Sequence, residues 1–360
     1  MTLVPTSYEL IGRILHTDIY NEKGTLLLGA GKLLNAKDID AMLINGVFEV
    51  AVKGAVGTAM PIDNVAPSLL QEIDEAWSYA PEMAGAYKEA LSGIKDLLEE
   101  AKHGAQPNVQ EVIARFSPLL THALENRYVF HPLHTLKGKD EYTYLHSINT
   151  GLLSGLIARL LGLPDAVCME VGVAGLFHDI GKLEVPDDIL NKPDELTQEE
   201  REHMRRHTQY GYALLRKIPG LPRSFADVAL LHHERLDGSG YPFGLRHENI
   251  PLSVQIVSVA DKFDALASDR VYRESVSPFE AAAVLWDAQF AGEMNPAIVT
   301  PFVMYILESY VSSRVRLSNG DEGVIVRYSL QDPLRPLVRT DAGEFVQLDV
   351  ERHIRITTVL

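Results

Sequence analysis

The spacing of apolar residues divides the chain into a helical middle and two β-rich ends. Between residues 126 and 312 the apolar positions recur with the period of a helix that is buried along one side. Capping sequences that begin at Thr197 and Ser277, and prolines between the periodic segments, support these boundaries. The predicted helices are Tyr142–Leu161, Pro164–Gly175 extending to Ile180, Thr197–Leu215, Ser224–Glu234, Ser253–Ala267, Pro278–Phe290 and Asn295–Val311.

Both ends of the chain have short apolar runs separated by turn sequences, which is typical of small β modules. In the last stretch, two runs flank the turn at Asn319-Gly320, and this arrangement predicts a hairpin. We therefore expect a mainly α protein, with an all-helical core and a β-rich module at each terminus. The predicted strands are Leu26–Leu28 and Val47–Val52, around a helix at Asn35–Leu43, and then Arg314–Leu317, Val324–Tyr328, Leu337–Arg339, Glu344–Leu348 and Ile354–Val359.

Residues 61–125 form a charged helical segment between the first module and the core. A proline-containing stretch at 61–67 leads into helical patterns over Leu69–Lys102 and then over about residues 108–128. Sustained heptads are absent, so packing onto the next domain is favoured over a coiled-coil stalk. A homodimer through residues 68–125 is the alternative. The predicted organisation is a β module at 1–60, a helical linker or stalk at 61–125, a helical domain at 126–312 and a β module at 313–360.

Charge and composition exclude several classes of function. The formal net charge of -16 argues against binding of nucleic-acid polymers and against docking on an anionic membrane. A small anionic substrate could still be attracted to the protein by metal ions and a few lysine or arginine side chains at its binding site. The single cysteine, Cys168, excludes an intrachain disulfide and a thiolate zinc cluster. We see no secretion signal and no uninterrupted apolar span of about eighteen residues, so we expect a cytoplasmic protein.

Histidine and aspartate residues recur through the helical region in the manner of metal ligands. His178-Asp179 and Asp261 each follow an apolar run, and a buried acid is costly unless it is paired or bound to a metal. His207 is a second candidate, whereas His203, four residues earlier and surrounded by charged residues, is expected at the surface. His232-His233 stands before a glycine-rich turn.

A set of nitrogen and carboxylate ligands without cysteine suits iron, manganese or zinc. Two ions can share a carboxylate and a water, and Asp179 is the natural bridge. The ions lower the pKa of that water, so that a metal-bridging hydroxide can attack phosphorus while Lys182 neutralises charge on the phosphate. Glu234 and Asp237 are expected to orient the histidines or to brace the loop.

Two sequence motifs together resemble the HD-GYP branch of the HD-domain metal-dependent phosphohydrolases. They are His178-Asp179-Ile-Gly-Lys182 and His232-His233-Glu-Arg-Leu-Asp-Gly-Ser-Gly-Tyr241-Pro242, and the similarity covers about residues 126–312. The resemblance implies an all-helical core and a centre of two or three ions, usually iron or manganese. It also implies hydrolysis of the bacterial second messenger cyclic di-GMP to pGpG, and often on to GMP.

The resemblance also assigns individual residues. Family members with three metals carry a glutamate four residues before the first histidine, where this chain has Tyr142 beside Glu141, so we expect two metals. Asp179 and Lys182 are then the catalytic residues. The positions that match metal ligands are His146, His178, Asp179, His207, His232, His233 and Asp261, and those that match substrate contacts are Lys182, Tyr241, Arg270 and Arg273.

Two other functions stay open at the level of sequence. The chain could be a catalytically silent receptor that binds cyclic di-GMP, or a signalling protein such as a diguanylate cyclase, through the same loop. Alternatively, it could hydrolyse another cyclic dinucleotide, because the metal motif does not encode recognition of guanine. The regulatory input is not evident, and residues 1–125 or a partner protein are the candidates.

Overall fold

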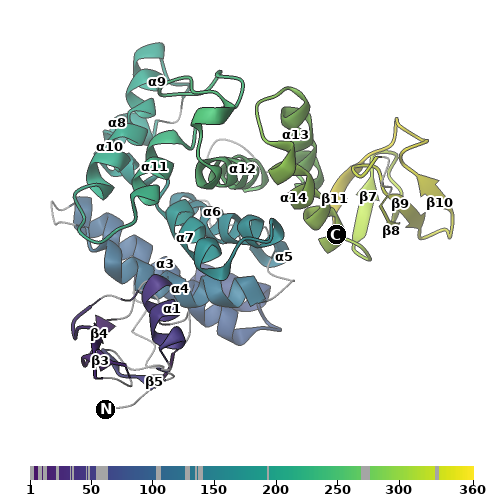
Figure 1. The fold of residues 1–360 in the computed structure, drawn as a ribbon. Coiled ribbons are helices and arrows are strands. Elements are labelled where there is room, and N and C mark those ends of the chain that lie inside the picture. The colour runs from purple at the N-terminus through teal and green to yellow at the C-terminus, as the bar shows by residue number, and fades with distance from the viewer. Residues whose placement is uncertain are drawn as a thin grey trace.

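The structure of the protein, a computed structural model, consists of a helical body with a β module at each end (Figure 1). The mainly α fold expected from the sequence is confirmed. The C-terminal module lies beside the last helix and away from the N-terminal one. The structure describes residues 4–6, 10, 14–21, 24–32, 34, 36–45, 47, 49–53, 64–102, 107–125, 130–133, 136, 141–192, 194–268, 276–328 and 332–360.

The body is built around helices α6 (Tyr142–Leu160) and α7 (Asp165–Leu176), which pack against each other. Every residue of α6 from Leu145 to Ala158 is buried, because other helices cover it on all sides. Helix α12 (Leu252–Ala267) also lies against α6. The remaining helices of this region are α5 (Phe130–Leu133), α8 (Asp187–Leu190), α9 (Gln198–Arg205), α10 (His207–Leu215), α11 (Arg223–Leu231), α13 (Pro278–Phe290) and α14 (Pro296–Ser309).

Glycines allow α6 and α7 to approach closely. A Cβ atom on Gly172 of α7 would lie 2.5 Å from Leu120 Cδ2 and 3.1 Å from the backbone oxygen of Gly151 of α6. Gly155 and Gly175 are similarly crowded. The small residues therefore set the distance between α6, which carries His146, and α7, which is followed by His178.

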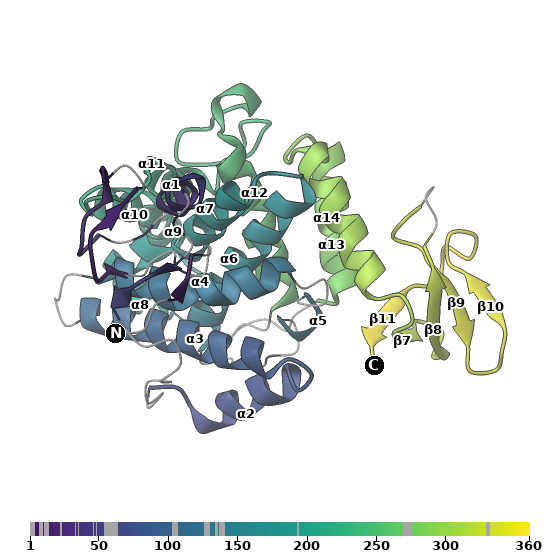
Figure 2. The same ribbon diagram turned by 60° about the horizontal axis from the view of Figure 1, so that its bottom comes forward.

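The segment before the body folds onto it (Figure 2). It contains α2 (Pro67–Ala76), α3 (Pro81–Lys102) and α4 (Val109–Glu125), of which α3 and α4 both contact α6. The prediction of one helix over Leu69–Lys102 was wrong, since the chain leaves the helix at Trp77 and starts another at Pro81. Proline disfavours helical backbone in the residue before it and lacks the N–H that a continuous helix requires.

Three predicted helices of the body are shorter than their apolar pattern suggested. The helix expected to reach Ile180 ends at Leu176, and a turn then leads into the 3₁₀ helix η3 (Ile180–Glu184). The helix expected over Thr197–Leu215 divides at Arg206. The helix expected to reach Glu234 ends at Leu231. The histidines of the candidate site lie at each of these breaks, where the apolar period continues but the helix does not.

The terminal modules are antiparallel, and the Asn319-Gly320 turn joins two strands as predicted. At the C-terminus, β7 (Arg314–Leu317), β8 (Glu322–Arg327), β9 (Leu337–Thr340), β10 (Phe345–Gln347) and β11 (Ile356–Val359) form one sheet in the order β10-β9-β8-β7-β11. The N-terminal module contains α1 (Ala36–Ile44), which contacts α7, and the pairs β1 (Val4–Pro5) with β5 (Glu49–Val50), β2 (Ile14–Leu15) with β6 (Val52–Lys53), and β3 (Ile19–Tyr20) with β4 (Leu26–Leu28).

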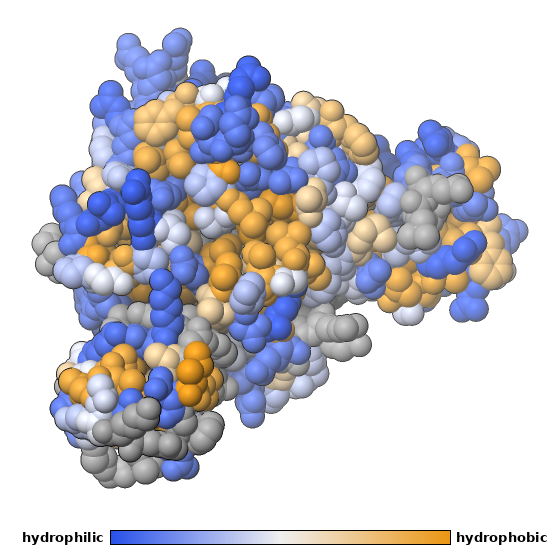
Figure 3. All heavy atoms as spheres, in the orientation of Figure 1, coloured by the Kyte–Doolittle hydropathy of each residue, from blue (hydrophilic) through white to orange (hydrophobic). Residues whose placement is uncertain are grey.

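The surface mixes polar and apolar side chains on the face drawn in Figure 3. Apolar residues on the N-terminal module include Leu26 and Ile44, both exposed. Among the described residues, the structure contains no helix with the length and hydrophobicity needed to cross a bilayer.

We predict that Gly172→Ala lowers the free energy of unfolding by about 1–3 kcal/mol, because the new methyl group overpacks against Leu120 of α4 and the backbone of Gly151 in α6. Gly85→Ala is the matched control: this helical glycine is exposed, and no neighbouring atom lies within 4 Å of the place its new methyl group would occupy. Its free energy of unfolding should therefore be unchanged or slightly higher. Denaturant unfolding of both variants checks this, and equal effects would contradict the role assigned to Gly172.

Candidate metal centre

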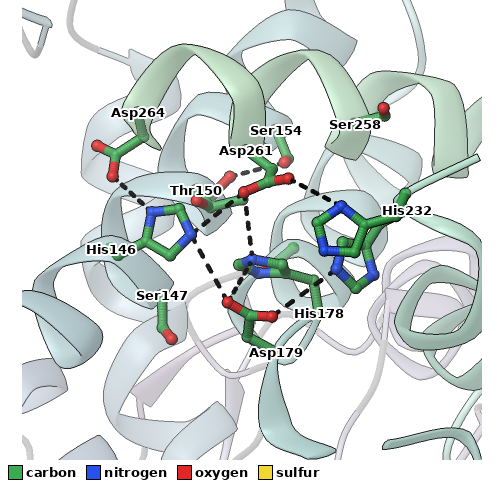
Figure 4. Close-up of polar contacts among 12 residues, drawn as sticks. His146, Ser147, Thr150, Ser154, His178, Asp179, His232, Ser258, Asp261 and Asp264 are labelled. Atoms are coloured by element: carbon green, nitrogen blue, oxygen red, sulfur yellow. Dashed lines mark hydrogen bonds and ion pairs between the residues drawn. The ribbon is translucent and has the colours of Figure 1, made fainter. Parts of the chain in front are cut away.

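Five histidines and two aspartates that are distant in the sequence meet inside the helical body (Figure 4). They are the seven residues that the sequence suggested as metal ligands. His146 comes from α6, His178 and Asp179 from the turn after α7, His207 from the first residue of α10, His232 and His233 from the end of α11, and Asp261 from α12.

Asp179 lies between two groups of imidazoles. Its Oδ2 atom is 3.2 Å from His178 Nε2 and 3.7 Å from His146 Nε2. Its Oδ1 atom faces the other way and is 3.3 Å from His207 Nε2 and 3.8 Å from His232 Nε2. A carboxylate whose two oxygens face different sets of nitrogen ligands has the arrangement of a bridge between two metal ions.

Asp261 closes the cluster from α12. Its Oδ1 atom lies 3.3 Å from His146 Nε2 and 3.7 Å from His178 Nε2. Its Oδ2 atom is 4.0 Å from Nδ1 of His233. The second carboxylate therefore also has one oxygen toward each side of the cluster.

Backbone carbonyls determine which nitrogen of three histidines faces the centre. A carbonyl oxygen only accepts hydrogen bonds, so the Nδ1 atom beside it must carry the proton and Nε2 presents its lone pair. Each partner is an oxygen near the end of the preceding helix or turn. These oxygens belong to Gly175 at 2.7 Å from His178, to Met204 at 2.8 Å from His207, and to Val228 and Ala229, both at 3.1 Å from His232.

The donor set fits divalent metal ions. The Nε2 atoms of His207 and His232 are 3.4 Å apart. Because both rings carry their proton on Nδ1, no hydrogen bond can form between these two Nε2 atoms. His178 Nε2 and Asp179 Oδ1 are buried and have no hydrogen-bond partner. Buried acceptors directed at one another are unfavourable unless a cation lies among them. Three overlapping groups of potential ligands result: His146, His178 and Asp179; Asp179, His207, His232 and His233; and His178, His232 and Asp261.

The electrostatics of the cluster favour the ligand forms of Asp179, His232 and His233. Burial alone raises the pKa of Asp179, but Lys182 and the neighbouring His178 outweigh it and hold this pKa well below its usual range. Burial lowers the pKa of His232 well below its usual range, and it lowers that of His233 to about 3. The carboxylate is therefore ionised and these two imidazoles are neutral at pH 7, as metal coordination requires.

Asp264 is a part of the site that the sequence pattern did not single out. It is fully buried, and its Oδ2 atom is 2.7 Å from Nδ1 of His146, opposite the Nε2 atom that faces the cluster (Figure 4). Burial lowers the pKa of His146, but hydrogen bonds to Asp261 and Asp264 raise it to about 9. The position of Asp264 one helical turn after Asp261 could have revealed it, because both acids then share one face of an apolar helix.

The loop after His232-His233 is braced by acidic side chains, as expected. Glu234 is buried, and its carboxylate accepts hydrogen bonds from the backbone N–H groups of Phe243 at 2.7 Å and Leu245 at 2.8 Å. Asp237 accepts from the N–H of Ser239 at 2.9 Å. The loop consequently folds back over the end of α11.

Two of the expected substrate contacts border the cluster. Lys182 Nζ is 2.5 Å from Asp179 Oδ2, and the ring of Tyr241 stacks on His233 with a centroid distance of 4.6 Å. Arg270 and Arg273 lie outside the described residues. His203 is half-buried and is absent from the groups of potential ligands found among the described residues.

Comparisons with known proteins match the helical region that contains this cluster. A family model described as an HD domain matches residues 130–297. A cyclic di-GMP phosphodiesterase of Pseudomonas aeruginosa is 42% identical over 204 residues, 57% of this chain and 49% of the relative. One of Thermotoga maritima is 40% identical over 181 residues, 49% of each chain. A 3′3′-cGAMP-specific phosphodiesterase of Vibrio cholerae is 39% identical over 147 residues, 41% of this chain and 32% of the relative.

The aligned region spans about half the length of the first two of these relatives. Among solved structures, an HDGYP protein from Bdellovibrio bacteriovorus aligns with a TM-score of 0.52 and 16% identity, covering 84% of this chain and 98% of the other. At that identity the match shows that the two chains share a fold.

We predict that Asp264→Asn weakens metal retention by about 10–100-fold, because the hydrogen bond that orients His146 loses its charged acceptor. Metal content per chain after dialysis against graded chelator, measured by mass spectrometry of the elements, checks this. Asp287→Asn, a change of the same kind at an exposed position of α13, should retain the wild-type content. Identical retention in both variants would show that Asp264 does not position His146.

Proposed function

Residues 130–297 match the model of the HD domain family. On this premise, we propose that the chain hydrolyses cyclic di-GMP to pGpG, with a second hydrolysis to GMP left open. The observation that carries the proposal is Asp179, whose two oxygens face separate groups of histidines while Lys182 lies beside it. The relatives described as cyclic di-GMP phosphodiesterases support the same substrate.

In the proposed reaction, the oxygen of a water forms a bond to phosphorus and the bond from phosphorus to the ribose O3′ breaks. The products are a 5′-phosphate and a free 3′-hydroxyl, which takes up a proton. Bound divalent ions, for which we propose two of iron or manganese, would supply Lewis acidity that acidifies water and withdraws charge from the phosphate.

The protein's own groups have distinct roles in this proposal. His146, His178, His207, His232, His233, Asp179 and Asp261 would hold the ions. Lys182, 2.5 Å from Asp179, would stabilise the charge that develops on the phosphate oxygens. Tyr241, stacked on His233, would line the substrate side of the centre.

Hydrolysis of another cyclic dinucleotide is the second candidate. The Vibrio cholerae relative that is described as specific for 3′3′-cGAMP favours it, because a similar sequence is associated there with a different base. A catalytically silent receptor fits less well, since all seven candidate ligands are present and converge. The homodimer through residues 68–125, a signalling partner and the cytoplasmic location stay predictions.

We predict two metal ions per chain in protein purified without oxygen, measured by mass spectrometry of the elements. The side chain of Tyr142 stacks its ring against His146, with the centroids 5.4 Å apart, at the position where a third ion would need a carboxylate. The neighbouring Glu141 is paired with Lys95 at 2.6 Å. Three ions per chain would contradict this expectation.

We predict that metal-loaded protein hydrolyses cyclic di-GMP to pGpG or to GMP. Chromatography of the products measures this. His178→Ala and Asp179→Ala should abolish turnover, because each of these side chains belongs to two of the three groups of potential ligands. His203→Ala, a histidine outside the cluster, should keep wild-type activity. A wild-type protein that releases neither product would refute the proposed function.

A further inference from the structure

Arg205 is a cation near the candidate metal centre, and it is neither a candidate metal ligand nor one of the expected substrate contacts. It is the last residue of α9 and is exposed. Its guanidinium carbon lies 4.8 Å from the centre of the Tyr241 ring. In the described part of the chain, no carboxylate lies within ion-pair distance of it, whereas Lys182 is paired with Asp179 and Lys192 with Glu200.

The cluster is most open to solvent on the side where Arg205 stands. The side chains of His146, His178, His207 and His232 are at most 3% exposed, but that of His233 is 22% exposed. Tyr241 stacks on His233, and Arg205 contacts the same tyrosine ring. A substrate that enters from solvent on this side would therefore meet Tyr241 and Arg205.

The chemistry of Arg205 suits a phosphate. A guanidinium group presents several N–H donors in a planar fork that matches two phosphate oxygens. Contact with an aromatic ring holds the group in place without occupying those donors. The chain as a whole has a net charge of -16, so a cation that has no carboxylate partner among the described residues locally favours an anionic ligand.

We propose that Arg205 binds the phosphate of the cyclic dinucleotide that is not being cleaved. This inference rests on the proposed function. A cyclic dinucleotide carries two phosphates on one small ring, so when one is at the metal centre the other must remain nearby. Lys182, in contact with Asp179, is placed to bind the phosphate at the metal centre. Arg205, which contacts the same Tyr241 ring that stacks on His233, is placed to bind the second.

The test compares a substrate with two phosphates and one with a single phosphate. For Arg205→Ala, KM for cyclic di-GMP should rise about tenfold while kcat changes little, because a charge-assisted contact outside the reacting bond is lost. Hydrolysis of bis(p-nitrophenyl) phosphate, which has no second phosphate, should be unchanged. Arg205→Lys should recover part of the loss in KM, since it keeps the charge but not the planar fork.

Arg206→Ala is the matched control, because it removes an exposed arginine one position along the same chain segment. It should leave the kinetics of both substrates at wild-type values. An unchanged KM for cyclic di-GMP in Arg205→Ala overturns the proposal. An equal loss on both substrates also overturns it, since the arginine would then support the loop or the centre instead of the second phosphate.

A binding measurement separates this proposal from the proposed function. Calorimetry of cyclic di-GMP with chelator-treated protein involves no turnover, and Arg205→Ala should bind about tenfold more weakly than the wild type. If metal-loaded wild-type protein does not hydrolyse cyclic di-GMP, the proposed function fails, but this comparison still decides the role of Arg205. Equal affinities, or no binding by the wild type, would refute that role.

Discussion

The candidate site depends on one buried carboxylate, that of Asp179. Burial of an ionised acid is unfavourable, so the surrounding structure has to supply positive or polarisable partners on every side. Lys182 and His178 supply them at one oxygen, and His207 lies at the other. The end of α7, the start of η3 and the start of α10 must therefore all lie close to this carboxylate.

Glycines in the two sequence motifs make this convergence sterically feasible. A Cβ atom on Gly181 would overlap the carbonyl oxygen of His207, so η3 and α10 can approach only because this residue has no side chain. A Cβ atom on Gly240 would overlap the backbone of Glu234 and Arg235 in the same way. The motifs thus combine residues that bear chemistry with residues that let the backbone segments come together.

Much of this protein could be predicted from local pattern. The helical body, the terminal β modules and the Asn319-Gly320 hairpin follow from periodicity and turn sequences. Helix ends at the site were predicted less well, because the apolar period runs on through His178 and His207 although the backbone turns there. At these breaks the histidine Nδ1 atoms bond to nearby carbonyls, an interaction that the apolar period does not encode.

The sequence by itself determined the residue types of the site, because histidine and aspartate in an apolar, cysteine-free context imply hard or borderline metal ligands. Only the tertiary structure decided how they are oriented. The carboxylate that orients His146 belongs to Asp264, 118 residues later in the chain, and Arg205 on α9 contacts Tyr241 in the loop after α11. Such contacts arise from the packing of helices, and packing between distant segments leaves no periodic signal in either one.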